Sequence, residues 1–194
     1  MLPAADNSIL IDAVFQEARE KGIRKVTASD IARRCNCSRQ TLYYHHVGGV
    51  NNVIEYVLLN DHKGITHTRP EEPYWRRETY RLLFSLKDRK EFYLDVYGTK
   101  YRSDLLTALT KHMKEDIIPD LLSCHQSRRS ERMGELNNLI AYVFVGRITQ
   151  WMTDGFHEDP SDILEILSRL CGPAMHRMAD DYLSFAPTPF STIA

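Results

Sequence analysis

Residues 27–46 read TASDIARRCNCSRQTLYYHH and have the pattern of two short helices joined by a tight turn. Thr27, followed three positions later by Asp30, resembles a capping box with Asp in place of the usual Glu or Gln. Asn36 falls where the turn requires a residue that tolerates a left-handed backbone conformation. Ser38 is a preferred N-cap residue and can begin the next helix. The segment therefore predicts two capped helices that meet at a turn near Asn36.

The second helix of this pair, expected over Ser38 to His45, carries side chains suited to contact with DNA. Leu42 is its core-facing residue. The outward positions are Arg39, Gln40, Thr41, Tyr43, Tyr44 and His45. Arg pairs with guanine edges, Gln pairs with adenine, and Thr and Tyr contact phosphates or the thymine methyl group. These features are the layout of a helix-turn-helix that reads DNA; the alternative is a surface helix of an ordinary helical bundle.

Cationic residues gather around this segment, although the chain as a whole is nearly neutral. The formal net charge of all 194 residues is -1, and the pI is about 6.7. Asp30 is the single acid between positions 21 and 46, where the cations are Lys21, Arg24, Lys25, Arg33, Arg34 and Arg39. A local basic face on a neutral protein suits a regulator that must release DNA as well as hold it.

Leu10 to Asp61 resembles the N-terminal DNA-binding domain of TetR-type transcriptional regulators. That domain has an amphipathic first helix ending in Gly, a second helix that is capped by Thr and contains Ile-Ala, and a third helix reading Thr-Leu-Tyr-x-His. The matching segments here are Ile9 to Lys21 with Gly22, Thr27 to Arg34, and Thr41 to His45. The resemblance implies phosphate contacts from Thr27, Tyr43 and His45, and base contacts from Arg39, Gln40, Thr41 and Tyr44, with Ser38 at the helix start.

Two positions depart from the family pattern. The family usually has an aromatic or aliphatic residue after the His and a Lys at the start of the fourth helix, whereas this chain has His46 and Gly49 there. Because a missing Lys removes a phosphate contact, we expect lower affinity for DNA and a shallower salt dependence than the family norm. The departures also motivate an alternative function, a TetR-like co-regulator that acts through a protein partner with weak or no DNA binding.

The rest of the chain keeps its apolar residues at helical spacing and contains no strand-like run. The expected helices are Val50 to Gly64, Trp75 to Lys87, Phe92 to Tyr97, Arg102 to His125 with a bend or break near Pro119, Glu135 to Asp154, and Pro160 to about Phe185 with Gly172-Pro173 as a candidate interruption. We predict an all-α fold. It comprises a three-helix helix-turn-helix DNA-binding domain over residues 1–48, a helical effector-binding and dimerisation bundle over 49–185, and a tail over 186–194.

Two long amphipathic segments near the C-terminus present more apolar surface than one small body can cover. Their apolar residues are Leu136, Leu139, Ile140, Val143 and Phe144 on the first, and Ile163, Leu164, Ile166, Leu167 and Leu170 on the second. Packed against their symmetry mates, the two helices would form the four-helix interface of a homodimer; the alternative is that both lie in the core of a monomer. A helix-turn-helix that reads a palindrome needs two copies about one DNA turn apart, which favours the dimer.

The segment from Val145 to Gly155, followed by Glu158-Asp159-Pro160, resembles the penultimate-helix signature of one branch of the TetR family. Some members related to that branch act as co-regulators of sugar-alcohol or dihydroxyacetone kinases. The resemblance thus reaches the C-terminal part of the chain as well.

An effector site is expected in the C-terminal bundle. Arg147 falls inside the apolar stripe formed on its helix by Leu136, Ile140, Val143 and Trp151. It must therefore find an anion, either an acidic side chain of this chain or the carboxylate or phosphate of an effector. Family members open a pocket among the middle helices, and aromatic residues there either line it or form core. The candidate effector-binding residues are Tyr97, Tyr142, Arg147 and Trp151.

Other protein classes find little support. No segment approaches the roughly 20 apolar residues that span a bilayer, and no cationic-then-apolar leader opens the chain, so we expect a cytoplasmic protein without membrane contact. Cys35 and Cys37 fit no zinc spacing; a metal site with His45 and His46 is the alternative to a packing role. Neither a nucleophile–base pair nor paired Glu-x-x-His elements occur, so we expect no enzyme activity, cofactor or metal. His62 and other scattered histidines are expected at the surface.

The function predicted from the sequence is a ligand-responsive transcriptional regulator that binds double-stranded DNA. We expect a repressor that binds a palindromic operator as a homodimer through its two C-terminal helices. An unknown small-molecule effector would shift the helix that links the two domains and change the spacing of the two reading helices.

Overall fold

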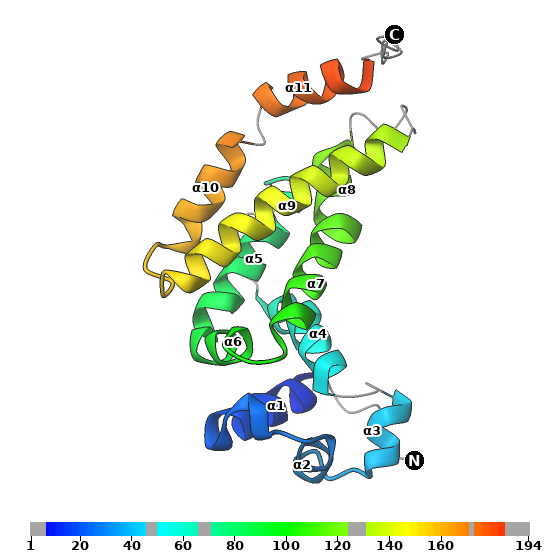
Figure 1. The fold of residues 1–194 in the computed structure, drawn as a ribbon, viewed down its shortest axis with the longest axis vertical. Helices are drawn as coiled ribbons and strands as arrows, with labels where there is room; N and C mark the ends of the chain where they lie inside the picture. Colours follow the sequence, from blue (N-terminus) through cyan, green and yellow to red (C-terminus); the bar gives the residue numbers. More distant parts are fainter. Residues whose placement is uncertain (1–6, 46–49, 66–70, 124–130, 171–172, 185–194) are drawn as a thin grey trace, which may run out of the picture.

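The computed structural model describes residues 7–45, 50–65, 71–123, 131–170 and 173–184, and these residues form helices with short connections and no strand. A small group of helices lies at one end of an elongated molecule (Figure 1). It comprises α1 (Asn7–Lys21), the 3₁₀ turn η1 (Ile23–Lys25), α2 (Ala28–Arg34) and α3 (Arg39–His45). We call residues 7–45 the head.

Helix α4 (Val50–Asp61) leads from the head into a larger helical bundle, which we call the body (residues 50–184). The other elements of the body are η2 (His62–Gly64), α5 (Tyr74–Asp88), α6 (Lys90–Tyr97), α7 (Arg102–His112), the π-helical turn η3 (Met113–Ile117), α8 (Ile118–Leu121), α9 (Glu131–Thr153), α10 (Pro160–Leu170) and α11 (Pro173–Ser184). In Figure 1, α6 and the start of α7 lie at the end of the body nearest the head, and α11 lies at the far end. The predicted all-α fold is confirmed.

Apolar residues at helical spacing hold the three short helices of the head together. Leu10 and Val14 of α1, Ile23 of η1, Ile31 of α2 and Leu42 of α3 are each at most 1% exposed. Isolated helices of this length are marginal in water, so burial of these side chains, at about 1.5–3 kcal/mol each, is what stabilises them. Leu42 lies in the core as predicted.

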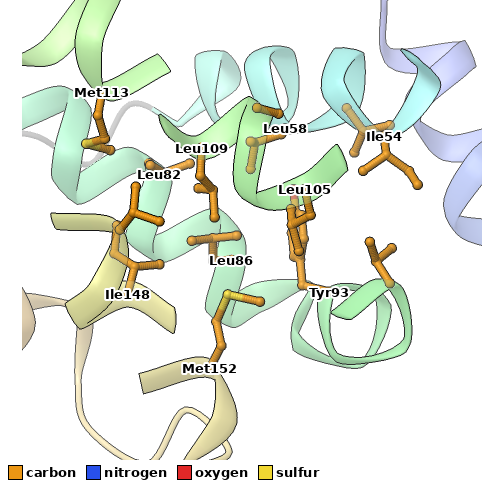
Figure 2. Close-up of a cluster of buried hydrophobic side chains, with 14 of the residues drawn as sticks. Ile54, Leu58, Leu82, Leu86, Tyr93, Leu105, Leu109, Met113, Ile148 and Met152 are labelled. Carbon is orange, nitrogen blue, oxygen red and sulfur yellow. The ribbon is translucent and has the colours of Figure 1, made fainter. Parts of the chain in front are cut away.

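The core of the body is built around α4, α5, α7 and α9. Ile54 and Leu58 of α4, Leu82 of α5, Leu109 of α7 and Ile148 of α9 are at most 1% exposed and point into one cluster (Figure 2). Helix α4 packs along α7 and also contacts α1. Helix α4 therefore belongs to both cores and joins the head to the body through packed side chains.

Two expected helices differ from the structure in where they break. The helix expected over residues 102–125 ends as α7 at His112, and the π-helical turn η3 follows before α8. Pro119 is the second residue of α8, where a missing backbone N–H leaves no helical hydrogen bond unmade. The break therefore precedes the proline. In the last segment, α10 ends at Leu170 and α11 begins at Pro173, as the Gly-Pro pair suggested.

Within the residues that the structure describes, no helix is both long enough and apolar enough to cross a membrane.

Candidate nucleic-acid interface

The caps predicted for α2 and α3 are present. The Thr27 hydroxyl accepts a hydrogen bond from the backbone N–H of Asp30 at 3.3 Å, and the Asp30 carboxylate accepts one from the backbone N–H of Thr27 at 3.0 Å. Asn36 has a φ of 51°, in the left-handed region. The Ser38 hydroxyl accepts from the backbone N–H of Thr41 at 2.9 Å. The turn and both helix starts therefore have the geometry of a helix-turn-helix.

Helix α3 exposes part of the surface that the sequence predicted for DNA contact. Arg39, Gln40 and Tyr43 are exposed. Arg39 donates to the Tyr43 hydroxyl at 3.3 Å, and its guanidinium lies 5.3 Å from the centre of the Tyr43 ring. Thr41 is half-buried, and its hydroxyl lies 2.8 Å from that of Ser38, so both hydroxyls first serve the cap. The backbone of residues 44 and 45 continues α3.

Four predicted positions lie wholly or partly outside the described residues. The side chains of Tyr44 and His45 belong to this group, as do His46 and Gly49, the two positions that depart from the family pattern. Their contacts with DNA stay predictions from the sequence.

Internal ion pairs neutralise half of the cations that the sequence gathers around the helix-turn-helix. Lys21 lies 2.8 Å from Glu17 and 2.7 Å from Asp30. Arg34 lies 2.8 Å from Glu17 and 2.6 Å from Glu20. Arg33 lies 3.1 Å from Asp30. The acids of α1 lie across from α2, outside the window in which the sequence shows only one acid, so the basic face is smaller than the sequence suggests.

These ion pairs also lower the pKa values of two acids of the head. Lys21 and then Arg34 hydrogen-bond to Glu17 and hold the pKa of this buried carboxyl below its ordinary value. The pKa of Asp30 is far below its ordinary value because Lys21 and then Thr27 donate to its carboxylate. Both acids are therefore charged at neutral pH, and their cationic partners on α1 and α2 support the head rather than a ligand.

The unpaired cations face a groove between the head and the body. Among the described residues, no carboxylate lies within ion-pair distance of Arg24, Lys25 or Arg39. All three line a groove of about 510 Å³ together with Thr27 and Tyr43. The groove thus adjoins the exposed face of α3 and contains two of the residues predicted to contact phosphates.

Sequence reasoning missed one side of this groove. Its wall is completed by Lys100 and Tyr101, which follow α6 and belong to the body. Nothing in the local sequence around residue 100 indicates nearness to the helix-turn-helix, because the proximity arises from the packing of α6 on the head.

The candidate effector residues do not gather around a shared hollow. Arg147 donates to the carboxylate of Glu158 at 2.6 Å, so this chain itself supplies the anion that Arg147 requires. Trp151 is completely buried and donates to the Glu158 carbonyl oxygen at 3.2 Å. Tyr142 is 64% exposed, and Tyr97 is half-buried beneath the guanidinium of Arg102.

A different hollow, of about 590 Å³, lies at the seam between α1 of the head and α5–α6 of the body. Its walls include Phe15 and Phe92, whose ring centres are 4.8 Å apart. Arg89 lies over the Phe15 ring at 4.6 Å. Beside it, the Asp95 carboxylate accepts a hydrogen bond from the backbone N–H of Ile23 at 2.6 Å. The seam therefore combines aromatic packing with a hydrogen bond from head to body.

The apolar residues of α9 and α10 divide into two faces. Those that lie in the core of the single chain are Leu136, Ile140, Phe144, Ile163, Leu164 and Leu167. Those left exposed are Leu139, Val143, Ile166 and Leu170, together with Tyr142. We call these five residues the apolar ridge. One face therefore lies in the core of the single chain, and the other is the exposed apolar face that the interface interpretation requires.

The structure gives the cysteines of the head a packing role. Cys35 and Cys37 are free and half-buried against the core. Burial, and to a lesser extent Cys37, raises the pKa of the Cys35 thiol to about 11. In the part of the chain that the structure describes, no three His, Cys, Asp or Glu residues are placed to hold a metal ion. His62 is buried rather than exposed as expected, with Nδ1 at 2.9 Å from the Leu58 carbonyl oxygen.

Two family models match the chain. One, described as bacterial regulatory proteins of the tetR family, matches residues 10–47 and so covers most of the head. The other, described as a transcriptional regulator C-terminal region, matches residues 74–172, from α5 to just beyond α10. No curated protein matches the sequence. A capped helix-turn-helix and a helical body that each match a regulator model show that this chain belongs to the TetR family of transcriptional regulators.

Proposed function

We propose that this regulator is a repressor that binds a palindromic operator as a homodimer and releases it when a small molecule binds. The observation that carries the proposal is the exposed face of α3. Arg39, Gln40 and Tyr43 lie on a helix whose start is held by the Ser38 cap and whose inner side is anchored by Leu42. A short helix held in this way is already ordered, so it can bind in a major groove with little further loss of conformational entropy.

We assign the DNA contacts by side-chain chemistry. Arg39 and Gln40 have the donors and acceptors for base edges. Thr27 and Tyr43 face the cationic groove and would bind phosphates, and His45 is assigned to phosphate by family resemblance. Ser38, Thr41 and Tyr44 complete the predicted contact surface. The hydroxyls of Ser38 and Thr41 would serve both the helix cap and the DNA.

The homodimer is proposed from the apolar ridge. Large apolar side chains are exposed on both α9 and α10, and a second copy would cover them by two-fold symmetry. In a four-helix arrangement, α9 and α10 would pack against the same two helices of the partner. Replacing Leu139 with Glu should then yield a monomer in light scattering. Leu94→Glu changes an apolar residue that is 37% exposed on α6 and should leave the dimer intact; a dimeric Leu139→Glu variant would contradict the assignment.

The ligand response is proposed at the seam between head and body. The hollow there has the volume of a small-molecule site, and Phe15 and Phe92 supply an apolar patch among walls that are otherwise mostly charged. A molecule bound in it would contact α1 and α6 at once, so it could prefer one arrangement of head and body over another. Only such a difference in affinity for two arrangements lets a ligand lower the affinity for DNA.

The test is selection of duplexes from a randomised pool, followed by titration of the selected duplex and of random DNA at low and at moderate salt. Arg39→Ala and Gln40→Ala should each weaken the preference for the selected duplex by about 1–3 kcal/mol. Tyr43→Phe combined with His45→Ala should weaken binding to both duplexes alike. Equal losses on both duplexes for the first two variants would show that the base assignment is wrong.

The alternative is a co-regulator that acts through a protein partner. The internal pairing of Lys21, Arg33 and Arg34 favours it, since fewer cations remain for phosphates than the sequence suggests. Absence of any binding to duplex DNA at low salt would reject the repressor and leave the co-regulator.

A further inference from the structure

We propose that Lys100, in the loop between α6 and α7, binds a phosphate of the DNA backbone together with the head. A single phosphate group would then lie across the seam between the two parts of the chain. This inference rests on the proposed DNA binding, and it adds to it a contact from the body that the helix-turn-helix does not include.

The chemistry of the groove carries the first step. Among the described residues that line it, four are cationic, three from the head and Lys100 from the body, and none is acidic. Ser29 and Tyr43 add hydroxyl groups that can donate to phosphate oxygens, whereas the Thr27 hydroxyl already donates to the Asp30 carboxylate at 2.6 Å. Clustered Lys and Arg side chains with hydroxyl donors are the groups that proteins use to hold the DNA backbone.

The side chain of Lys100 is available for this role. It is exposed, and within the described ranges no carboxylate pairs with it. Its ammonium group lies 5.1 Å from the centre of the Tyr101 ring. An ammonium group near an aromatic face at this distance gains a cation–π interaction without being neutralised. Lys100 is thus partly oriented without an ion pair that would compete with a phosphate.

The loop that carries Lys100 is held by its own hydrogen bonds. The Thr99 hydroxyl donates to the Val96 carbonyl oxygen at 2.8 Å and accepts from the backbone N–H of Tyr101 at 3.3 Å. Farther back on α6, Asp95 binds the backbone N–H of Ile23 at 2.6 Å. The loop is therefore fixed to the end of α6, and Asp95 ties α6 to the head.

The groove is continuous with the surface proposed to read DNA. Arg39 and Tyr43 line the groove and also lie on the exposed face of α3. The first turn of α4 reads Val50-Asn-Asn and supplies no cation on this side. Since α3 would enter the major groove, the adjoining backbone phosphates would pass the mouth of this site, where Lys100 provides a charge that α4 lacks.

A phosphate held from both sides has a regulatory consequence. Bound DNA would stabilise the arrangement in which Lys100 lies beside the head. Any displacement of α6 from the head would in turn remove one phosphate contact from each subunit. Movement of the body would therefore lower affinity for all DNA sequences, in addition to any change in the spacing of the two heads.

The experiment measures the affinity for the selected duplex and for random duplex over a fourfold range of KCl, for the wild type, Lys100→Gln and Lys100→Arg. Each lost phosphate contact reduces the slope of log K against log salt by about 0.9. Lys100→Gln should therefore lose about 3.5-fold more affinity per subunit at the lowest salt than at the highest. Both duplexes should be affected equally, and Lys100→Arg should retain the slope.

The matched control is Lys63→Gln, which removes one charge from an exposed lysine of η2 that does not line the groove. Its slope should equal that of the wild type. A Lys100→Gln slope equal to that of the wild type would overturn the inference while leaving the proposed DNA binding intact. Absence of wild-type binding at low salt would overturn both.

A second arm separates DNA from small anions. Melting of the DNA-free protein is followed in inorganic phosphate and in chloride at equal ionic strength. The same melting temperature in both salts, together with a reduced slope of log K for DNA against log salt in Lys100→Gln, supports a contact with the DNA backbone. Stabilisation by phosphate that disappears in Lys100→Gln, with an unchanged DNA slope, would make the groove a small-anion site and refute the proposal.

Discussion

Replacing Asp95 should loosen the head from the body without unfolding the body. The Asp95 carboxylate on α6 accepts the hydrogen bond from the backbone N–H of Ile23 at 2.6 Å. Ile23 is completely buried. In Asp95→Ala this N–H loses its acceptor, whereas Asp95→Asn can still offer an uncharged amide oxygen at the same place. The two variants therefore separate the charge of the acceptor from its presence.

The magnitude follows from the burial of the two partners. A hydrogen bond to a charged group contributes about 1.5–3 kcal/mol, and a buried donor without a partner costs a similar amount. Because Asp95 is only half-buried, water partly screens its charge, and we expect about 1.5–2 kcal/mol for Asp95→Ala. That is a change of about 12- to 30-fold in the local opening equilibrium. Asp95→Asn should lose about half as much, since neutral hydrogen bonds are roughly half as strong.

Amide hydrogen exchange is the suitable assay because it reports local opening. Protection of the Ile23 amide should fall by the factor given above in Asp95→Ala, while amides of α5 around Leu82, in the core of the body, keep their protection. Glu91→Ala, which removes an exposed acid from the same helix, is the control and should leave Ile23 protected. Unchanged exchange at Ile23 in Asp95→Ala, or an equal loss around Leu82, would refute the reasoning.

Three further changes test other parts of the structure. The cationic partners of buried Glu17 lower its pKa, so its ionised carboxylate stabilises the fold fully above the ordinary pKa of 4.5, and this stabilisation is lost as the pH falls through the lower folded-state pKa. The free energy of unfolding should therefore decrease below about pH 4.5. In denaturant titrations, Glu17→Gln should make the free energy of unfolding less dependent on pH in this range. Ser38→Ala removes the acceptor of the Thr41 N–H and should destabilise α3 by about 1 kcal/mol, measured by exchange at Thr41, with Ser38→Asn as the capped control. The Glu158 side chain is 42% exposed, so Arg147→Met should cost no more than about 1 kcal/mol in urea unfolding; a loss of several kcal/mol would mean that the pair is far more strongly coupled.

The sequence was informative wherever a short-range rule decides the conformation. The capping pattern at Thr27 and Asp30, the left-handed turn at Asn36 and the cap at Ser38 each depend on residues within a few positions, and all are present. The Gly-Pro pair before α11 is a rule of the same kind, because proline accommodates the first turn of a helix but not its interior. The irregularity expected near Pro119 is present as the π-helical turn that directly precedes α8.

Side-chain contacts between different elements of the fold could not be predicted from such local rules. Whether Arg147 met an effector or an acid of its own chain depended on the turn that brings Glu158 back to α9. His62 has polar neighbours in the sequence, yet its side chain lies under α5 with Glu78 at 3.5 Å. In each case the deciding contact joins residues that lie on different elements of the fold.

The sequence by itself determined that the chain has a capped helix-turn-helix on an all-α body, because caps, turns and apolar periodicity are local properties of the chain. Only the tertiary structure decided which charges remain free. Packing brings the acids of α1 onto Arg34 of α2 and brings Asp30 of α2 onto Lys21, and it brings Lys100 from the body to the side of the head. Electrostatic pairing depends on distance in space, and the fold alone sets that distance for residues far apart along the chain.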